Sequence, residues 1–93
     1  MSGAQFPQSK RRVFFKVSAL RAKEVYLVGT FNDWDATSRP LKLGKEGVWR
    51  TYMALTPGTY EYRFLVDGEW RNDPGAEMVE NTYGTQNCVR VVP

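Results

Sequence analysis

The fold is decided by the stretch GTYEYRFLVDGEW, residues 58–70, which contains a strand, a tight turn and the start of a second strand. Apolar or aromatic residues occupy every second position from Tyr60 to Val66, a period typical of a half-buried β-strand. The pair Asp67-Gly68 that follows favours a two-residue type I′ turn. The stretch therefore predicts an antiparallel hairpin.

The turn determines which side chains share a face of this hairpin. With Asp67 and Gly68 at its centre, Leu65 lies opposite Trp70, and Arg63 lies diagonal to Trp70 on the same face. The other face points into the core and carries Tyr60, Tyr62, Phe64 and Val66. We therefore expect Arg63 and Trp70 to lie next to each other at the surface.

The same alternation recurs on both sides of the hairpin, and no segment has helical periodicity. Strands are predicted at residues 11–18, 25–29, 48–55, 59–66, 69–72 and 87–92, with a weaker one at 40–43. Short strands separated by turn residues at this spacing are typical of a small sandwich. We predict an all-β chain, an immunoglobulin-like antiparallel β-sandwich of about six to eight short strands over residues 11–93, after a flexible lead-in at residues 1–10.

The distribution of charge argues against a nucleic-acid partner. The chain has 13 Lys and Arg against 10 Asp and Glu, and Lys10, Arg11 and Arg12 are the only charged residues before Val13. The remaining basic residues equal the acidic ones in number, so the body of the domain has little of the field that binds phosphates. We expect no nucleic-acid partner.

The residue types present also limit the kinds of site that the chain can form. The chain has no histidine, the commonest general base and transition-metal ligand. Cys88 is the only cysteine, so no intrachain disulfide forms, and a cytoplasmic location fits best. No apolar run approaches the ~18 residues of a membrane span. We therefore expect no metal, no cofactor and no membrane partner.

Two of the three tryptophans lie at positions where the sequence pattern does not predict burial. Trp34 lies in the polar loop FNDWD, residues 31–35, and Trp70 shares its hairpin face with charged side chains. An exposed indole offers a flat apolar surface to the C–H face of a sugar ring, and aromatic packing adds roughly 0.5–1.5 kcal/mol per contact. The alternative is that one or both rings cap the edge of the core. Trp49 lies between Val48 and Arg50 within a predicted strand, which favours a structural role.

Polar residues close to these tryptophans in the expected fold suit a neutral ligand. Arg63 can donate hydrogen bonds to hydroxyl groups from a planar fork, or can be an ordinary solvated strand charge paired with a carboxylate. Thr85, Gln86 and Asn87 provide donors and acceptors in another loop, although Asn and Thr before a strand are commonly turn formers. Together with the tryptophans, these residues favour sugar recognition.

Three ordered motifs make the chain similar to a known family. They are EVYLVGTFNDW at residues 24–34, the hairpin at residues 58–70, and Asp73-Pro74 followed by YGTQN at residues 83–87. With this order and spacing the chain resembles carbohydrate-binding module family 48, most of all the glycogen-binding domain of the AMP-activated protein kinase β subunit. The likeness covers the chain from about Arg12 to Val92.

The resemblance implies non-catalytic binding of α-1,4-linked glucan, such as glycogen, starch, malto-oligosaccharide or cyclodextrin. The site residues that it implies are Trp34, Arg63, Trp70, Tyr83, Thr85 and Asn87. Both tryptophans match sugar-stacking positions, and Thr85 and Asn87 match polar contacts. Arg63 stands where the glycogen-binding domain usually has a lysine, and Tyr83 stands at an aliphatic position, so an aromatic ring can stack there instead.

Alternative functions stay open on the residues alone. The main one is a protein-interaction or structural module, because exposed aromatic residues are also enriched at protein interfaces. The resemblance implies that such a module would belong to a larger glycan-active enzyme, for example of glycoside hydrolase family 13, or to a kinase-regulatory protein. Carboxylate pairs for glycoside hydrolysis would be Asp33 with Asp35, or Glu61 with Glu69. A calcium site would use Asn32 with the two loop aspartates, which supply fewer than the six to eight oxygens that Ca²⁺ takes.

Overall fold

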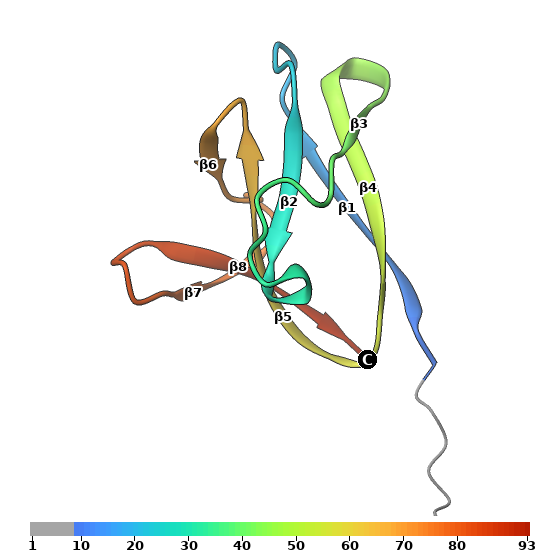
Figure 1. Ribbon diagram of the computed structural model, residues 1–93, viewed down its shortest axis with the longest axis vertical. Helices are drawn as coiled ribbons and strands as arrows, with labels where there is room; N and C mark the ends of the chain where they lie inside the picture. The colour runs from blue at the N-terminus through green and yellow to red at the C-terminus, as the bar shows by residue number, and fades with distance from the viewer. Residues whose placement is uncertain (1–8) are drawn as a thin grey trace, which may run out of the picture.

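The alternating apolar residues produce two antiparallel β-sheets packed face to face, as the computed structural model of residues 9–93 shows (Figure 1). The first sheet has the order β1 (Arg11–Ser18), β4 (Val48–Leu55), β3 (Lys42–Leu43). The second has the order β2 (Val25–Gly29), β5 (Gly58–Val66), β8 (Gln86–Val92), β7 (Glu77–Glu80), and β6 (Glu69–Arg71) also pairs with β5. The predicted all-β sandwich is confirmed. Of the predicted lead-in, residues 1–8 lie outside the described part of the chain.

Two short 3₁₀ segments, η1 (Thr30–Asn32) and η2 (Lys45–Gly47), interrupt the strands. Within residues 9–93, no helix is long and apolar enough to cross a lipid bilayer.

The strand bounds agree with the prediction to within two residues, but the prediction missed β7. This strand, Glu77–Glu80, pairs with β8 so that Met78 lies opposite Cys88. Its two apolar residues between two glutamates are too few to display a period of two. The pairing with β8, rather than the local sequence, makes this segment a strand.

The hairpin of β5 and β6 has the predicted register, with Leu65 opposite Trp70. Asp67 and Gly68 have φ angles of 48° and 83°, as both central residues of a type I′ turn require. The Oδ1 atom of Asp67 accepts hydrogen bonds from the backbone N–H groups of Glu24 and Lys23, both at 2.9 Å. These bonds lower the pKa of the Asp67 carboxyl and join the turn to the segment before β2.

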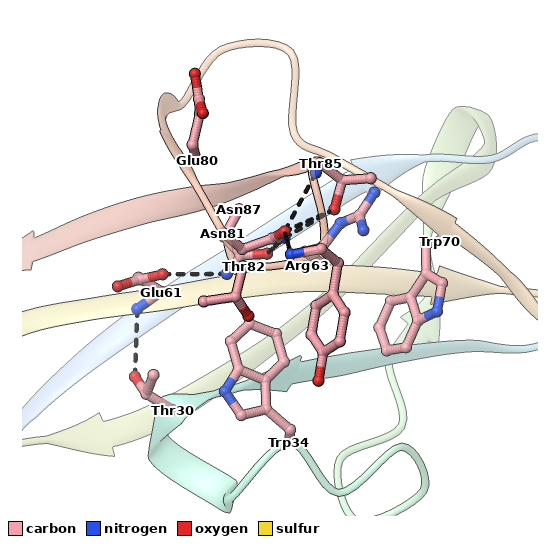
Figure 2. A pocket seen from close by; sticks show the side chains of 11 residues that line it. Thr30, Trp34, Glu61, Arg63, Trp70, Glu80, Asn81, Thr82, Thr85 and Asn87 are labelled. Carbon is pink, nitrogen blue, oxygen red and sulfur yellow. Dashed lines mark hydrogen bonds between the residues drawn. The ribbon is translucent and has the colours of Figure 1, made fainter.

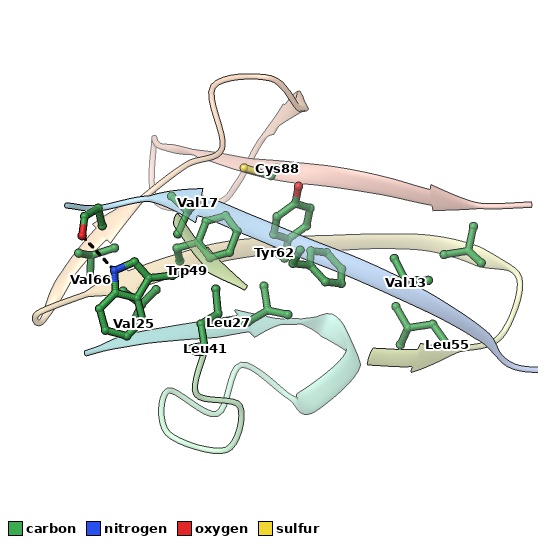
Figure 3. Close-up of a cluster of buried hydrophobic side chains, with 14 residues drawn as sticks. Val13, Val17, Val25, Leu27, Leu41, Trp49, Leu55, Tyr62, Val66 and Cys88 are labelled. Carbon is green, nitrogen blue, oxygen red and sulfur yellow. Dashed lines mark hydrogen bonds between the residues drawn. The ribbon is translucent and has the colours of Figure 1, made fainter. Parts of the chain in front are cut away.

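The core lies between the sheets and is built from the inward faces of both (Figure 3). The rings of Phe15 on β1 and Tyr62 on β5 meet edge to face, 4.9 Å apart between centroids. Tyr62 also packs against Phe64 in the same manner. Burial raises the pKa of the Tyr62 hydroxyl to about 12, so this group is a neutral member of the core at physiological pH.

Trp49 is the structural tryptophan, as predicted. Its ring is buried in the core, and its Nε1 donates a hydrogen bond of 2.9 Å to the backbone carbonyl of Ala19 (Figure 3). The indole thereby joins β4 to the end of β1. A buried indole needs such an acceptor because an unpaired buried N–H group costs stability.

Gly29, the last residue of β2, lies so close to β5 that no side chain fits. A Cβ atom there would meet the carbonyl oxygen of Glu61 at 2.5 Å and the Phe31 ring at 2.7 Å. The Gly29 backbone also accepts the hydrogen bond that begins the Trp34 loop. The close contact between β2 and β5 thus depends on this glycine.

We expect Gly29→Ala to lower the free energy of unfolding by roughly 1–3 kcal/mol, because the added methyl group forces the two strands apart. Thermal unfolding followed by circular dichroism measures this loss. Gly75→Ala is the matched control, since its Cβ atom would meet only the Asp73 carboxylate, at 3.6 Å. Equal unfolding temperatures for the two variants would contradict this account.

Candidate functional site

An open groove of about 980 Å³ lies on the outward face of the second sheet (Figure 2). All six site residues expected from the sequence line it: Trp34, Arg63, Trp70, Tyr83, Thr85 and Asn87. Five further residues complete the lining: Thr30, Glu61, Glu80, Asn81 and Thr82. The volume is at the upper end of the range of small-ligand sites.

Trp34 presents its ring from the loop after η1. Both Asp33 and Trp34 have left-handed backbone conformations, with φ angles of 54° and 58°. For a residue with a Cβ atom this conformation costs about 1–2 kcal/mol. The backbone N–H of Trp34 donates to the carbonyl of Gly29 at 2.9 Å, and the indole is 38% exposed. The loop therefore uses strained backbone to present an apolar ring to solvent, as functional loops often do.

Asn32 holds this loop in place. Its Oδ1 accepts a hydrogen bond from the Gly29 N–H at 3.0 Å, and its Nδ2 donates to the Leu27 carbonyl at 3.2 Å and to the Ser38 hydroxyl at 3.0 Å. Asp35 caps the following turn through two hydrogen bonds to Thr37. Of the oxygens suggested as calcium ligands, Asn32 Oδ1 and Asp35 Oδ1 are thus already acceptors within the loop.

Trp70 and Arg63 lie together, as their hairpin register predicts. The guanidinium carbon of Arg63 is 5.6 Å from the centre of the Trp70 ring, within the range of a cation–π contact, and the indole is 47% exposed. Asn72 fixes the arginine, because its Oδ1 accepts from Arg63 Nε at 2.7 Å while its Nδ2 donates to the Gln86 carbonyl at 2.8 Å. This bond occupies Nε and leaves the terminal nitrogens of Arg63 as the further donors of the guanidinium.

Tyr83 projects from a loop that a second asparagine organises. The Oδ1 atom of Asn81 accepts hydrogen bonds from the backbone N–H groups of Tyr83, at 2.9 Å, and Thr85, at 3.2 Å. Between them, Gly84 takes a positive φ of 80°, which glycine adopts at little cost. The Tyr83 ring is 89% exposed, so it is the most accessible large side chain of the groove.

Asn87 lines the groove and is largely enclosed. Its Nδ2 donates to Glu61 Oε1 at 3.0 Å, and its Oδ1 accepts from Asn81 Nδ2 at 2.9 Å. It lies in β8 with Gln86, so of the three polar residues expected in one loop only Thr85 lies in a loop. Its partners hold Asn87 in one orientation, with one N–H of its amide outside these two bonds.

The sequence analysis did not identify Asn72 and Asn81 as site residues. Asn72 follows Trp70 by two positions, and a period of two places both on the same face of a strand. Asn81 precedes Thr-Tyr-Gly, a combination typical of a turn closed by an asparagine side chain. Both signals are present in the sequence, but neither reveals which side chain the asparagine holds.

The groove combines stacking surfaces with mixed hydrogen-bond donors and acceptors. Of the carboxylates suggested for hydrolysis, only Glu61 lines it, and one of its oxygens already accepts from Asn87. Among residues 9–93, no cluster of three or more His, Cys, Asp or Glu side chains is placed to hold a metal ion. Rings flanked by an arginine, amides and hydroxyls suit a neutral ligand rich in hydroxyl groups.

Comparison with known proteins agrees with this geometry. The family described as the glycogen recognition site of AMP-activated protein kinase matches residues 13–93. Protein FLOURY ENDOSPERM 6, chloroplastic, of Oryza sativa subsp. japonica is 36% identical over 83 residues, which are 89% of this chain and 16% of that protein. Protein PTST homolog 2, chloroplastic, of Arabidopsis thaliana is 45% identical over 71 residues, or 76% of this chain and 13% of that protein.

A third relative is a kinase subunit. The 5'-AMP-activated protein kinase subunit beta-1 of Sus scrofa is 40% identical over 67 residues, which are 72% of this chain and 52% of that sequence. The chain thus spans about half of this relative and less than a fifth of the two plant proteins.

We expect Asn81→Ala to loosen the Tyr83 loop, because two backbone N–H groups lose their acceptor. Hydrogen exchange at the amides of Tyr83 and Thr85 should become about two- to tenfold faster, the size expected for a lost hydrogen bond. Thr82→Ala, in the same loop, leaves this acceptor in place and is the control. Unchanged exchange in Asn81→Ala would show that Asn81 does not hold the loop.

Proposed function

The chain belongs to the family of the glycogen recognition site of AMP-activated protein kinase, a family of carbohydrate-binding modules, and we propose that it binds α-1,4-linked glucan between Trp34 and Trp70. The observation that carries this proposal is the convergence of two exposed indoles on one groove with Arg63 and a polar rim. The proposed role is non-catalytic, and the ligands are glycogen, starch and shorter malto-oligosaccharides.

Stacking supplies the apolar part of the proposed binding. Each indole is partly exposed and partly packed, and we propose that the exposed part of each ring meets a sugar. The C–H groups of a glucose ring can pack on the face of an indole, and pairs of aromatic rings, for comparison, gain roughly 0.5–1.5 kcal/mol beyond the area buried. Tyr83, which is more exposed than either indole, offers a third ring at the rim.

Hydrogen bonds supply the directional part. Arg63 donates from a guanidinium that Asn72 holds beside Trp70, and Thr85 offers a hydroxyl from the loop that Asn81 organises. Asn87 is held by two neighbours and is left with one amide N–H for a sugar hydroxyl. Because these groups are held before binding, little side-chain entropy is lost when the glucan arrives.

The first test is calorimetry with β-cyclodextrin, a ring of α-1,4-linked glucose. We expect dissociation constants of roughly micromolar to millimolar, because a few stacked rings must offset the lost motion of ligand and side chains. Trp34→Ala and Trp70→Ala should each weaken binding about tenfold or more, and the double variant should abolish it.

The matched control is Leu43→Ala, which removes an exposed apolar side chain from β3 of the other sheet. It should bind β-cyclodextrin as the unmodified chain does. If no heat is released at millimolar β-cyclodextrin, or if the tryptophan double variant binds normally, the proposal is wrong.

The second test concerns the linkage. The two indoles come from separate elements, the loop after η1 and strand β6, and we propose that they hold the glucan at an angle to each other. This arrangement suits a chain that bends at each α-1,4 bond better than a flat β-1,4 chain. In affinity electrophoresis, soluble amylose should retard the protein and hydroxyethyl cellulose should not. Equal retardation by both polymers would refute this specificity.

A further inference from the structure

The outward face of the first sheet carries basic residues and no acidic ones. Strands β1, β3 and β4 contain no Asp or Glu. The exposed charged and aromatic side chains on their solvent side, here called the basic face, are Arg12, Phe14, Lys16, Lys42, Arg50 and Tyr52. The inward residues of β1, which alternate with these, are buried in the core. We propose that the basic face binds an acidic segment of a partner polypeptide.

Three of the cations form a row across the sheet. Lys16 of β1 lies directly opposite Arg50 of β4, and Arg50 lies directly opposite Lys42 of β3. Side chains opposite each other on a sheet have Cβ atoms about 4.5–5.5 Å apart, and like charges at this distance destabilise the pairing. Folding alone therefore gives no reason for the row. Carboxylates placed between these cations would remove the repulsion and gain charge-assisted hydrogen bonds.

Two exposed aromatic rings stand beside this row. Phe14 and Tyr52 are cross-strand partners with ring centroids 5.9 Å apart, and they are 63% and 49% exposed. The guanidinium of Arg12 lies 4.8 Å from the centre of the Tyr52 ring. Exposed aromatic residues together with arginine are enriched at protein interfaces, where they act as anchors. The basic face thus combines apolar anchors with positive charge.

The size and charge of the molecule favour a short acidic peptide over a nucleic acid. The row spans three strands, which places its outer members only about 10 Å apart. All ten acidic residues of the chain lie outside the strands of this sheet. They would repel a long polyanion that extends past the basic face. The relatives also fit a protein partner, because each contains the matched region within a longer protein and one is named as a kinase subunit.

The basic face and the groove lie on opposite sides of the sandwich. On β5, Glu61 and Arg63 face the groove. Tyr62 and Phe64, which alternate with them, face the core between the two sheets. A peptide on the basic face therefore leaves the groove accessible. The inference is independent of the proposed glucan binding, and the two activities can be measured separately.

The test uses fluorescence anisotropy with a labelled octapeptide of six glutamates and two tyrosines, EEYEEYEE, in about 50 mM salt. The unmodified chain should bind the peptide, and added salt should weaken the binding because the attraction is between charges. Lys16→Gln combined with Arg50→Gln should weaken it at least about tenfold, and Phe14→Ala should weaken it as well. The charge variant should also unfold at a slightly higher temperature, since the like-charge row is relieved.

The matched control is Arg21→Gln combined with Arg71→Gln, which removes the same charge from outside the basic face. It should keep the peptide affinity of the unmodified chain, and both double variants should keep β-cyclodextrin binding if that activity exists. Equal weakening by the two double variants would show that only net charge matters and would overturn the proposal. Tighter binding of octathymidylate than of the peptide, or no peptide binding at millimolar concentration, would overturn it too.

Discussion

The two-faced alternation of β5 is the constraint on which the rest of the structure depends. Tyr62 and Phe64 point into the core, and Glu61 and Arg63 point into the groove. The same strand pairs with β2 on one edge and with β6 and β8 on the other. A slip of one residue would exchange the two sets of side chains, exposing aromatic rings and burying charges. The Asp67-Gly68 turn prevents this slip, because both of its residues adopt the positive φ that a two-residue hairpin needs.

Asparagine side chains hold the aromatic residues and the arginine of the groove in place. Asn32 fixes the loop that presents Trp34, Asn72 fixes Arg63, and Asn81 fixes the loop that presents Tyr83. An asparagine suits this role because its short side chain both donates and accepts hydrogen bonds. The left-handed backbone at Trp34 is a further cost of presenting the ring. The protein thus orders its loops during folding, which reduces the entropy that a ligand must offset on binding.

The two sides of the sandwich differ in charge, which the overall composition does not reveal. Apart from the basic residues at positions 10–12, acidic and basic residues are equal in number, and this balance argues against binding to a long polyanion. The strands of the first sheet nevertheless contain only basic charges, while Glu61 and Glu80 line the groove on the other side. A chain whose basic and acidic residues balance outside positions 10–12 can therefore present two different surfaces, the groove and the basic face.

Features of the fold that depend on neighbouring residues could be predicted from the sequence. All strands except β7, the register of the β5–β6 hairpin and the contact of Arg63 with Trp70 follow from a period of two and from turn chemistry, which act within a few residues. For Trp34 and Trp70 the sequence left open whether the rings cap the core, and the structure shows both partly exposed. Tertiary structure alone decided what depends on distant strands. β7 becomes a strand by pairing with β8, Asn87 is enclosed by Glu61 and Asn81, and the row of Lys16, Arg50 and Lys42 comes from three strands of the first sheet. Such contacts are fixed only when the sheets form, because local sequence preference does not encode the register between strands far apart in the chain.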